Sequence, residues 1–386
     1  MNLINERLRI VLIYLAFISG ITPFNYFNIN VEHFPYGILI ALFTFSITWR
    51  ALFFLIGIVT FYLLSVAYYK AIGLDPSLSY LIQTLNFISP LLFYHKSKHH
   101  LIRIARNVFW IYIIIGCMQF LHLLVPLEPI FDLFISRFSG KPLAGYRGVT
   151  MLETEPARAS FQLLFLYFIS EGQQEKEDIK KTITLILAQI FLICSTTGIF
   201  LTACLLIIKY WKEIIAKVNL ITLTVITIIA VIGYQYALEN PKIKIFYDEI
   251  THYGIEGGYN ALAATSGGRF LAATATISNI IQWPLGYGAD PEFFSKNTDE
   301  IDQYSIAGYR TWVSSRPISA ILNFLYVYGL VITCFLVLLI LSMNRGKKVS
   351  ILTLGILMIG TLYSPPGTAV LLIALLISFK GKGVTS

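Results

Sequence analysis

The sequence predicts an all-α polytopic membrane protein with about twelve transmembrane helices and two large outer loops that contain short interfacial helices. Hydrophobic residues make up 56% of the 386 residues, and charged residues only 13%. The mean hydropathy is +0.71. Apolar runs of membrane-helix length recur along the whole chain. This composition excludes an ordinary soluble domain.

The net charge of +8 is spread in short basic clusters between apolar runs. This pattern indicates topology signals rather than a nucleic-acid surface, so no nucleic-acid partner is expected. The four cysteines lie inside apolar runs, and no Cys/His metal spacing is present. An apolar run follows Arg7 and Arg9 without a small-residue cleavage site, and we interpret it as a first membrane helix rather than a signal peptide.

Each apolar run is predicted to form one helix, because roughly 20 apolar residues cross the hydrocarbon core and shorter runs are typical of half-inserted helices. In chain order the predicted helices are 8–24, 35–49, 51–69, 78–94, 104–126, 157–170, 181–194, 196–209, 219–237, 317–342, 350–363 and 366–379.

Lysine and arginine fall on one side of the membrane if every predicted helix is crossed in turn, and that side is cytoplasmic. The basic groups are His95–Arg103, Lys176 with Lys180 and Lys181, Lys209 with Lys212, Arg345–Lys348, and Lys380 with Lys382. Residues 1–386 then form a single transmembrane domain with both termini in the cytoplasm. Residues 127–156 and 238–316 form the two large outer loops.

The second large loop, 238–316, is too long and polar to be a simple connection. Within it, residues 271–281 have an uncharged, amphipathic helical pattern that suits the membrane boundary. Arg269 precedes this pattern and follows two glycines, which let the backbone approach a ligand closely. We therefore predict a functional role for Arg269. The alternative is an interfacial arginine that snorkels to the membrane surface.

The first large loop, 127–156, supplies further candidates. Arg137 and Arg147 lie in a glycine-containing stretch, and Glu155 and Arg158 lie at the start of the next predicted helix. A charge at the membrane rim is a functional candidate. The alternative is that Glu155 and Arg158, three residues apart, simply pair and anchor the helix end.

Other candidates lie in the second large loop. Trp283 and Tyr287 are candidates for stacking on sugar rings, although aromatic residues also gather at membrane interfaces for packing. Arg310 and Arg316, with Tyr309 nearby, are candidate ligand contacts or members of an aromatic belt. His252 is a candidate proton acceptor, with a structural role as the alternative.

Outward-facing arginines from both loops favour capture of a diphosphate, because guanidinium groups bind phosphate oxygens in pairs and stay charged. The outer segments contain neither a phosphate-binding GxxxxGK[ST] motif nor an Asp-x-Asp metal motif. We therefore expect a reaction that needs no metal and no cofactor.

Several motifs, taken in order, resemble the O-antigen ligase/polymerase superfamily, and most closely the Wzy-type O-antigen polymerases. The shared elements run from about residue 140 to 363 and are Glu155-Pro156, Cys194-Ser-Thr-Thr-Gly198, Ser266-Gly-Gly-Arg269, Trp283-Pro-Leu-Gly-Tyr-Gly288, and the helix from Pro317 to Gly329 with Leu322, Asn323 and Tyr328. The ligase branch carries a histidine before the glycine of that helix. Here Ile318-Ser319 stands in its place, which favours a polymerase over a ligase.

The resemblance implies a GT-C-type glycosyltransferase in the bacterial inner membrane. Such an enzyme joins undecaprenyl-diphosphate-linked repeat units at the periplasmic face, and its partners include membrane lipid and a chain-length regulator. It implies functional roles for Arg269 and for Arg147 or Arg137. We expect these arginines, helped by Arg158, Arg310 or Arg316, to bind the diphosphate, and Glu155 or His252 to accept a proton.

Three alternatives stay open at this point. O-antigen ligase is the closest, and a flippase or transporter for lipid-linked oligosaccharides is the alternative of another class. The sequence shows no internal repeat and few polar residues inside the predicted helices, which disfavours a transporter. A non-catalytic membrane scaffold is the third alternative.

Overall fold

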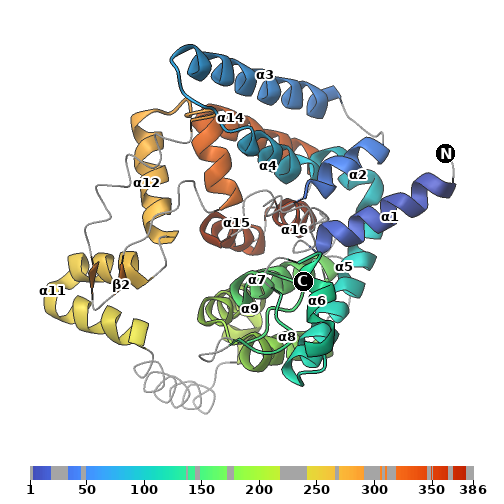
Figure 1. Ribbon diagram of the computed structural model, residues 1–386, viewed down its shortest axis with the longest axis vertical. Helices are drawn as coiled ribbons and strands as arrows, with labels where there is room; N and C mark the ends of the chain where they lie inside the picture. The colour runs from blue at the N-terminus through green and yellow to red at the C-terminus, as the bar shows by residue number, and fades with distance from the viewer. Residues whose placement is uncertain are drawn as a thin grey trace.

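The structure, a computed structural model, is built almost entirely of α-helices (Figure 1). It describes residues 3–18, 34–44, 49–135, 138–143, 148–171, 178–217, 241–265, 269–290, 305–306, 309–310, 319–345, 349, 351–363 and 368–379. The predicted helix 219–237 lies outside these residues.

The described part of the first half of the chain forms a series of helices. Their bounds are α1 Leu3–Phe17, α2 Tyr36–Thr44, α3 Trp49–Ala71, α4 Ser79–Ile88, α5 Pro90–Phe120, the 3-10 helix η2 Val125–Leu127, α6 Glu128–Asp132 and α7 Pro156–Glu171. Proline opens both α5 and α7. This position suits proline, because the first N–H groups of a helix have no partner within the helix.

The second half continues with α8 Ile179–Leu187, the π-helical turn η3 Ala188–Ile193, α9 Thr196–Lys217, α11 Pro241–Thr265, α12 Arg269–Gln282, α14 Ala320–Met343, α15 Ile351–Tyr363 and α16 Val370–Ser378. Two short antiparallel strands, β1 Ser305–Ile306 and β2 Tyr309–Arg310, lie beside α11. The predicted helix at 271–281 in the second large loop is confirmed as α12.

Helix α7 forms the centre of the core. All of its residues from Ala159 to Ser170 are buried, and it packs against α5, α16, α9, α8 and η3. Figure 1 shows α7 among these helices, with α3 along one edge of the molecule and α11 and α12 at another side. The helix that begins with the Glu155-Pro156 motif is therefore deeply enclosed over twelve consecutive residues.

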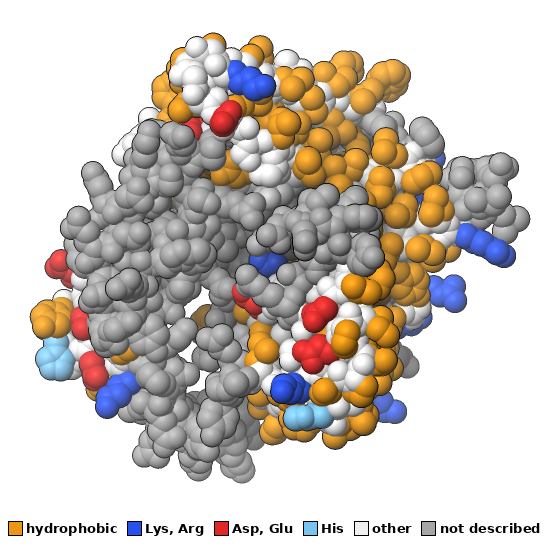
Figure 2. All heavy atoms as spheres, in the orientation of Figure 1, with side chains coloured by type: hydrophobic (Ala, Val, Ile, Leu, Met, Phe, Trp, Pro, Cys, Tyr) orange, Lys and Arg blue, Asp and Glu red, His pale blue; other side chains and the backbone are white. Residues whose placement is uncertain are grey.

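Three of the described helices are long and apolar enough to cross a membrane, namely α3, α5 and α14. Helix α3 buries only Ala51, Ile58 and Tyr62 and exposes large apolar side chains such as Trp49, Phe53 and Leu64. Figure 2 shows hydrophobic side chains over α3 and along the neighbouring edge of this face. An apolar surface of this extent suits lipid rather than water, which agrees with an all-α membrane protein.

Helix α5 differs from the sequence prediction. The predicted cytoplasmic connection His95–Arg103 is not a loop but part of one continuous helix from Pro90 to Phe120. At 1.5 Å per residue its 31 residues extend about 46 Å, well beyond a hydrocarbon core of about 30 Å. Basic residues mark a membrane boundary without breaking a helix, because lysine, arginine and histidine all tolerate helical backbone. The break between helices comes earlier, where α4 ends at Ile88 and α5 begins at Pro90.

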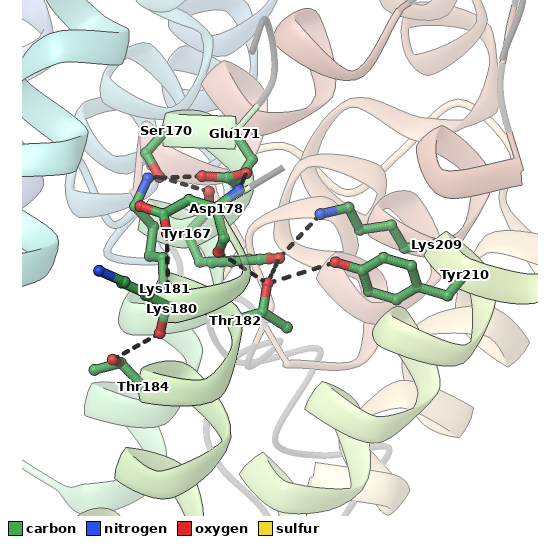
Figure 3. Close-up of polar contacts among 10 residues, drawn as sticks. All are labelled: Tyr167, Ser170, Glu171, Asp178, Lys180, Lys181, Thr182, Thr184, Lys209 and Tyr210. Atoms are coloured by element: carbon green, nitrogen blue, oxygen red, sulfur yellow. Dashed lines mark hydrogen bonds and ion pairs between the residues drawn. The ribbon is translucent and has the colours of Figure 1, made fainter. Parts of the chain in front are cut away.

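One of the predicted topology lysines is instead buried. Lys181 Nζ lies 2.6 Å from Glu171 Oε1 and 3.3 Å from Ser170 Oγ, and its side chain is 1% exposed. Asp178 caps the start of α8 by accepting from the backbone N–H of Lys181. Figure 3 shows these side chains converging where α7 ends and α8 begins. The ion pair therefore holds the end of α7 against the start of α8.

A second polar group lies beside this ion pair (Figure 3). Lys209 Nζ donates to the Tyr167 hydroxyl at 2.9 Å and lies over the rings of Tyr167 and Tyr210. The Thr182 hydroxyl is 2.6 Å from that of Tyr167. These contacts tie α9 to α7 and α8, so Lys209 stabilises packing as well as marking a boundary.

We expect Lys181→Met to lower the free energy of unfolding by about 3–5 kcal/mol, because it leaves the buried Glu171 carboxylate without its cation. Lys181→Met combined with Glu171→Leu should recover most of the loss. Denaturant unfolding in detergent measures both effects, and the neighbouring exposed Lys180 provides the control Lys180→Met. Equal stability of Lys181→Met and Lys180→Met would contradict a role for the ion pair.

Candidate functional site

Residues 283–290, which we call the strap, connect helix α12 to a break in helix α14. The break is at Gly329, whose backbone leaves the helical range with φ 69° and ψ −175°. In an unbroken helix Leu330 N–H would donate to the Tyr326 carbonyl. Here Tyr287 N–H donates to the Tyr326 carbonyl at 2.8 Å, and Leu330 N–H donates to the Pro284 carbonyl at 2.8 Å. The strap thus takes up hydrogen bonds that the break in α14 leaves open.

Two glycines make this close contact possible. Gly286 has φ +88°, and a Cβ atom built on it would lie 2.5 Å from Gly329 N. A Cβ atom on Gly329 would overlap with the carbonyl oxygen of Pro284. Both positions need a residue without a side chain and with positive φ, and only glycine meets both requirements without strain. The two glycine motifs of the sequence therefore meet backbone to backbone.

Aromatic and hydroxyl groups fix the strap to its neighbours. The Tyr287 ring stacks on that of Tyr326 at 5.1 Å between centroids, and the Tyr287 hydroxyl donates to the Asn279 carbonyl at 2.9 Å. Partial burial raises the pKa of Tyr287, so the hydroxyl keeps its proton. From α3, Tyr69 donates to the Tyr287 carbonyl and Ser65 accepts from Ala289 N–H. The strap joins α3, α12 and α14 into one unit.

Ser65, Tyr69 and Tyr326 carry no recognised motif, and sequence analysis did not select them. The only signal was spacing: Ser65 and Tyr69 are four residues apart and so share one face of α3. Trp283, at the start of the strap, is 52% exposed. Of the two predicted aromatic candidates, Trp283 therefore offers a free surface, while one face of Tyr287 is covered by Tyr326.

Arg269 is the first residue of α12, at the opposite end of that helix from the strap. The first N–H groups of a helix have no partner within it, and the helix dipole is positive at this end. An arginine at this position adds its charge to a backbone end that already favours anions. The side-chain position of Arg269 is outside the described atoms.

Glu155 precedes α7 and Arg158 lies in its first turn, and both are half-buried. The Cys194-Ser-Thr-Thr-Gly198 motif lies against the same helix. A Cβ on Gly198 would overlap with the Ser160 hydroxyl, and Ser160 donates to Gln189 at 2.6 Å. The structure thus brings two motifs from different parts of the chain, Glu155-Pro156 and Cys194–Gly198, onto α7.

His252 lies exposed on α11, and its Nδ1 is 2.7 Å from the Asp248 carbonyl oxygen. Because a carbonyl only accepts, Nδ1 carries the proton and Nε2 has the free lone pair in the neutral ring. This tautomer suits a proton acceptor. The same helix bends nearby at Gly254, where φ is 64°.

The remaining predicted site residues fall partly or wholly outside the described residues. Arg137, Arg147 and Arg316 lie outside them. Tyr309 and Arg310 form β2, opposite Ile306 and Ser305 of β1, and only their backbone is described. Among the described elements α12 packs on α14, α11 and α15, whereas α7 packs on a different set of helices. The structure therefore describes two groups of candidate residues, one on α12 with the strap and one on α7.

Ser319 stands where the family resemblance would put the ligase histidine. Ser319 is fully buried and caps α14, because its hydroxyl accepts from Leu322 N–H at 3.0 Å. Within the described part of the chain, no group of three or more His, Cys, Asp and Glu side chains is placed to hold a metal ion.

Comparison with known protein families, curated proteins and solved structures finds no match to this chain.

Proposed function

We propose that this protein is a polysaccharide polymerase of the O-antigen type in the bacterial inner membrane. It joins undecaprenyl-diphosphate-linked repeat units at the periplasmic face, where the two large loops lie. The proposal is supported by one observation above all. Two motifs 40 residues apart, Trp283–Gly288 and Tyr328-Gly329, form one backbone junction directly attached to the helix that Arg269 begins.

This arrangement suits recognition of a diphosphate. The junction holds one end of α12, so the other end, with Arg269 and the first N–H groups of the helix, is carried on a braced helix. Guanidinium and backbone N–H donors that are fixed in advance stabilise charge best as it develops on a leaving group. Arg147 and Arg158 from the first large loop, with Arg137, Arg310 and Arg316, complete the cationic set in this proposal.

In the proposed reaction a sugar hydroxyl of one lipid-linked unit attacks the anomeric carbon of the growing chain on another lipid. The bond from that carbon to the diphosphate oxygen breaks, and the lipid diphosphate leaves with the electron pair. Glu155 accepts the hydroxyl proton, and His252, through Nε2, is the second candidate for this role. A single displacement of this kind inverts the anomeric carbon.

The test is a reaction with purified protein and a lipid-diphosphate-linked repeat unit, with the products resolved by size. A ladder of products supports a polymerase. A second reaction adds lipid A core as the acceptor, and transfer of the glycan to this acceptor, without a ladder in the first reaction, would identify a ligase. No new glycosidic bond in either reaction would overturn the enzymatic proposal.

Metal removal is expected to leave the reaction unchanged, because in this proposal arginines rather than a metal ion neutralise the diphosphate. The measurement is ladder formation with and without EDTA after dialysis against chelator. A loss of product that returns with added Mg²⁺ or Mn²⁺ would contradict the metal-independent mechanism.

The break in α14 favours a second candidate of another class, a transporter of lipid-linked oligosaccharides. Interrupted membrane helices are typical of transporters, where they surround the substrate site. The strap, however, occupies the hydrogen-bonding groups that the break exposes. Movement of labelled lipid-linked glycan across vesicles, without any increase in glycan length, would favour this candidate over the polymerase.

A further inference from the structure

One face of helix α5 carries three buried residues that contact the first large loop. Tyr112, Gly116 and Gln119 are spaced by four and three residues, so they lie on one face of the helix. We call these three residues the receptor strip. The loop segment they contact is 150–153, with Ser139 beside it.

Gln119 holds the loop backbone from two sides. Its Nε2 donates to the carbonyls of Ser139 at 2.7 Å and Met151 at 3.2 Å, and its Oε1 accepts from Met151 N–H at 2.7 Å. Met151 has φ 53°, a left-handed backbone that is unfavourable for a residue with a side chain. The paired amide contacts compensate for that cost and select this one loop conformation.

Tyr112 binds the same segment through a buried carboxylate. Its hydroxyl donates to Glu153 Oε1 at 2.6 Å, and Glu153 is only 2% exposed. A hydrogen bond to a charged acceptor is among the stronger ones in proteins. Between these contacts, Gly116 leaves space for Met151, because a Cβ on Gly116 would lie 2.8 Å from Met151 Cε.

The segment is anchored on its other side by η3. Val149 N–H donates to the Leu192 carbonyl at 2.8 Å. Gly148 lies directly against the same turn, where a Cβ would overlap with the carbonyl oxygens of Leu192 and Ile193. Residues 148–153 are therefore held between α5 and η3, and this held segment ends two residues before Glu155.

We propose that the receptor strip positions Glu155 for catalysis by fixing residues 148–153. This inference rests on the proposed function, in which Glu155 accepts the proton. Tyr112 and Gln119 use the hydrogen bonds described above to hold the loop, so they act through it as positioning residues. Displacing the base even slightly weakens proton transfer, since catalysis depends on the distance between the reacting groups.

Hydrogen exchange measures the hold on the loop without reference to activity. We expect Gln119→Leu to accelerate exchange in peptides covering 148–153, because Met151 N–H loses its acceptor, while peptides from α7 stay protected. The matched control is Tyr94→Phe, which removes a buried hydroxyl from the same helix that donates to Leu376 in α16. Unchanged exchange in 148–153 would overturn the inference.

Kinetics measure the positioning. Tyr112→Phe, the milder variant, should lower kcat roughly tenfold to a hundredfold with KM for the lipid-linked unit changed less than about twofold, while Tyr94→Phe stays at the wild-type rate. If either Gln119→Leu or Tyr112→Phe exchanged faster in residues 148–153 but kept the wild-type kcat, the positioning role would be overturned. If wild-type protein forms no ladder, the proposed function and the role of Glu155 fail together, while exchange still decides whether the strip holds the loop.

Discussion

Arg269→Ala is expected to reduce ladder formation by a factor of about a hundred to a thousand while the protein reaches the membrane at its normal level. The reason is electrostatic: the lipid diphosphate gains negative charge as it leaves, and a fixed guanidinium stabilises that charge in the transition state. The N-terminal position of Arg269 in α12 makes this loss specific, because the helix end that remains still favours anions but lacks the bidentate donor.

Arg269→Lys separates charge from geometry. It keeps the positive charge but not the fork of donors, so we expect intermediate activity. Arg103→Ala, an exposed arginine on α5, is the control for loss of an arginine away from the proposed site. Rates are measured at equal concentrations of purified protein, and the amount of each variant in the membrane is measured separately. Full polymerisation by Arg269→Ala would contradict the proposed mechanism.

The sequence predicted the elements whose pattern is local. The uncharged amphipathic run at 271–281 became α12, and Pro156 marked the start of the buried helix α7. Both signals depend on neighbouring residues only, namely helical periodicity and the tolerance of proline at a helix start. Gly286 and Gly329 both belong to motifs that carry the family resemblance. The predicted helix 317–342 nevertheless runs unbroken through Gly329, whereas α14 breaks there, and the sequence did not show that the two glycines touch.

Sequence patterns did not predict the features that depend on tertiary contacts. Nothing local distinguishes Lys181, which pairs with buried Glu171, from its exposed neighbour Lys180. The basic run 95–103 separates the predicted helices 78–94 and 104–126, whereas α5 continues through it. Gln119 gave no signal, because a buried amide is recognisable only by the loop groups it contacts. These contacts join residues far apart in the chain, so no pattern of neighbours predicts them.

Gly329→Ala is expected to cost roughly 2–6 kcal/mol of stability and to abolish ladder formation, since two separate penalties combine. The first is backbone strain, because alanine disfavours φ 69° with ψ −175°. The second is steric, because the added methyl group overlaps with the Pro284 carbonyl. Release of the strap would free the end of α12 that it braces, so activity should fall together with stability.

Two other glycines separate these penalties. Gly254 has φ +64° but no heavy atom within 4 Å of a built Cβ, so Gly254→Ala tests strain alone. Gly57, inside α3, likewise has nothing within 4 Å, and Gly57→Ala should be neutral or slightly stabilising. Thermal unfolding in detergent should rank the variants with Gly329→Ala least stable, Gly254→Ala intermediate and Gly57→Ala most stable. If Gly329→Ala were no worse than Gly254→Ala, the contact between the strap and α14 would contribute nothing, and α12 would need another brace to hold Arg269 in place.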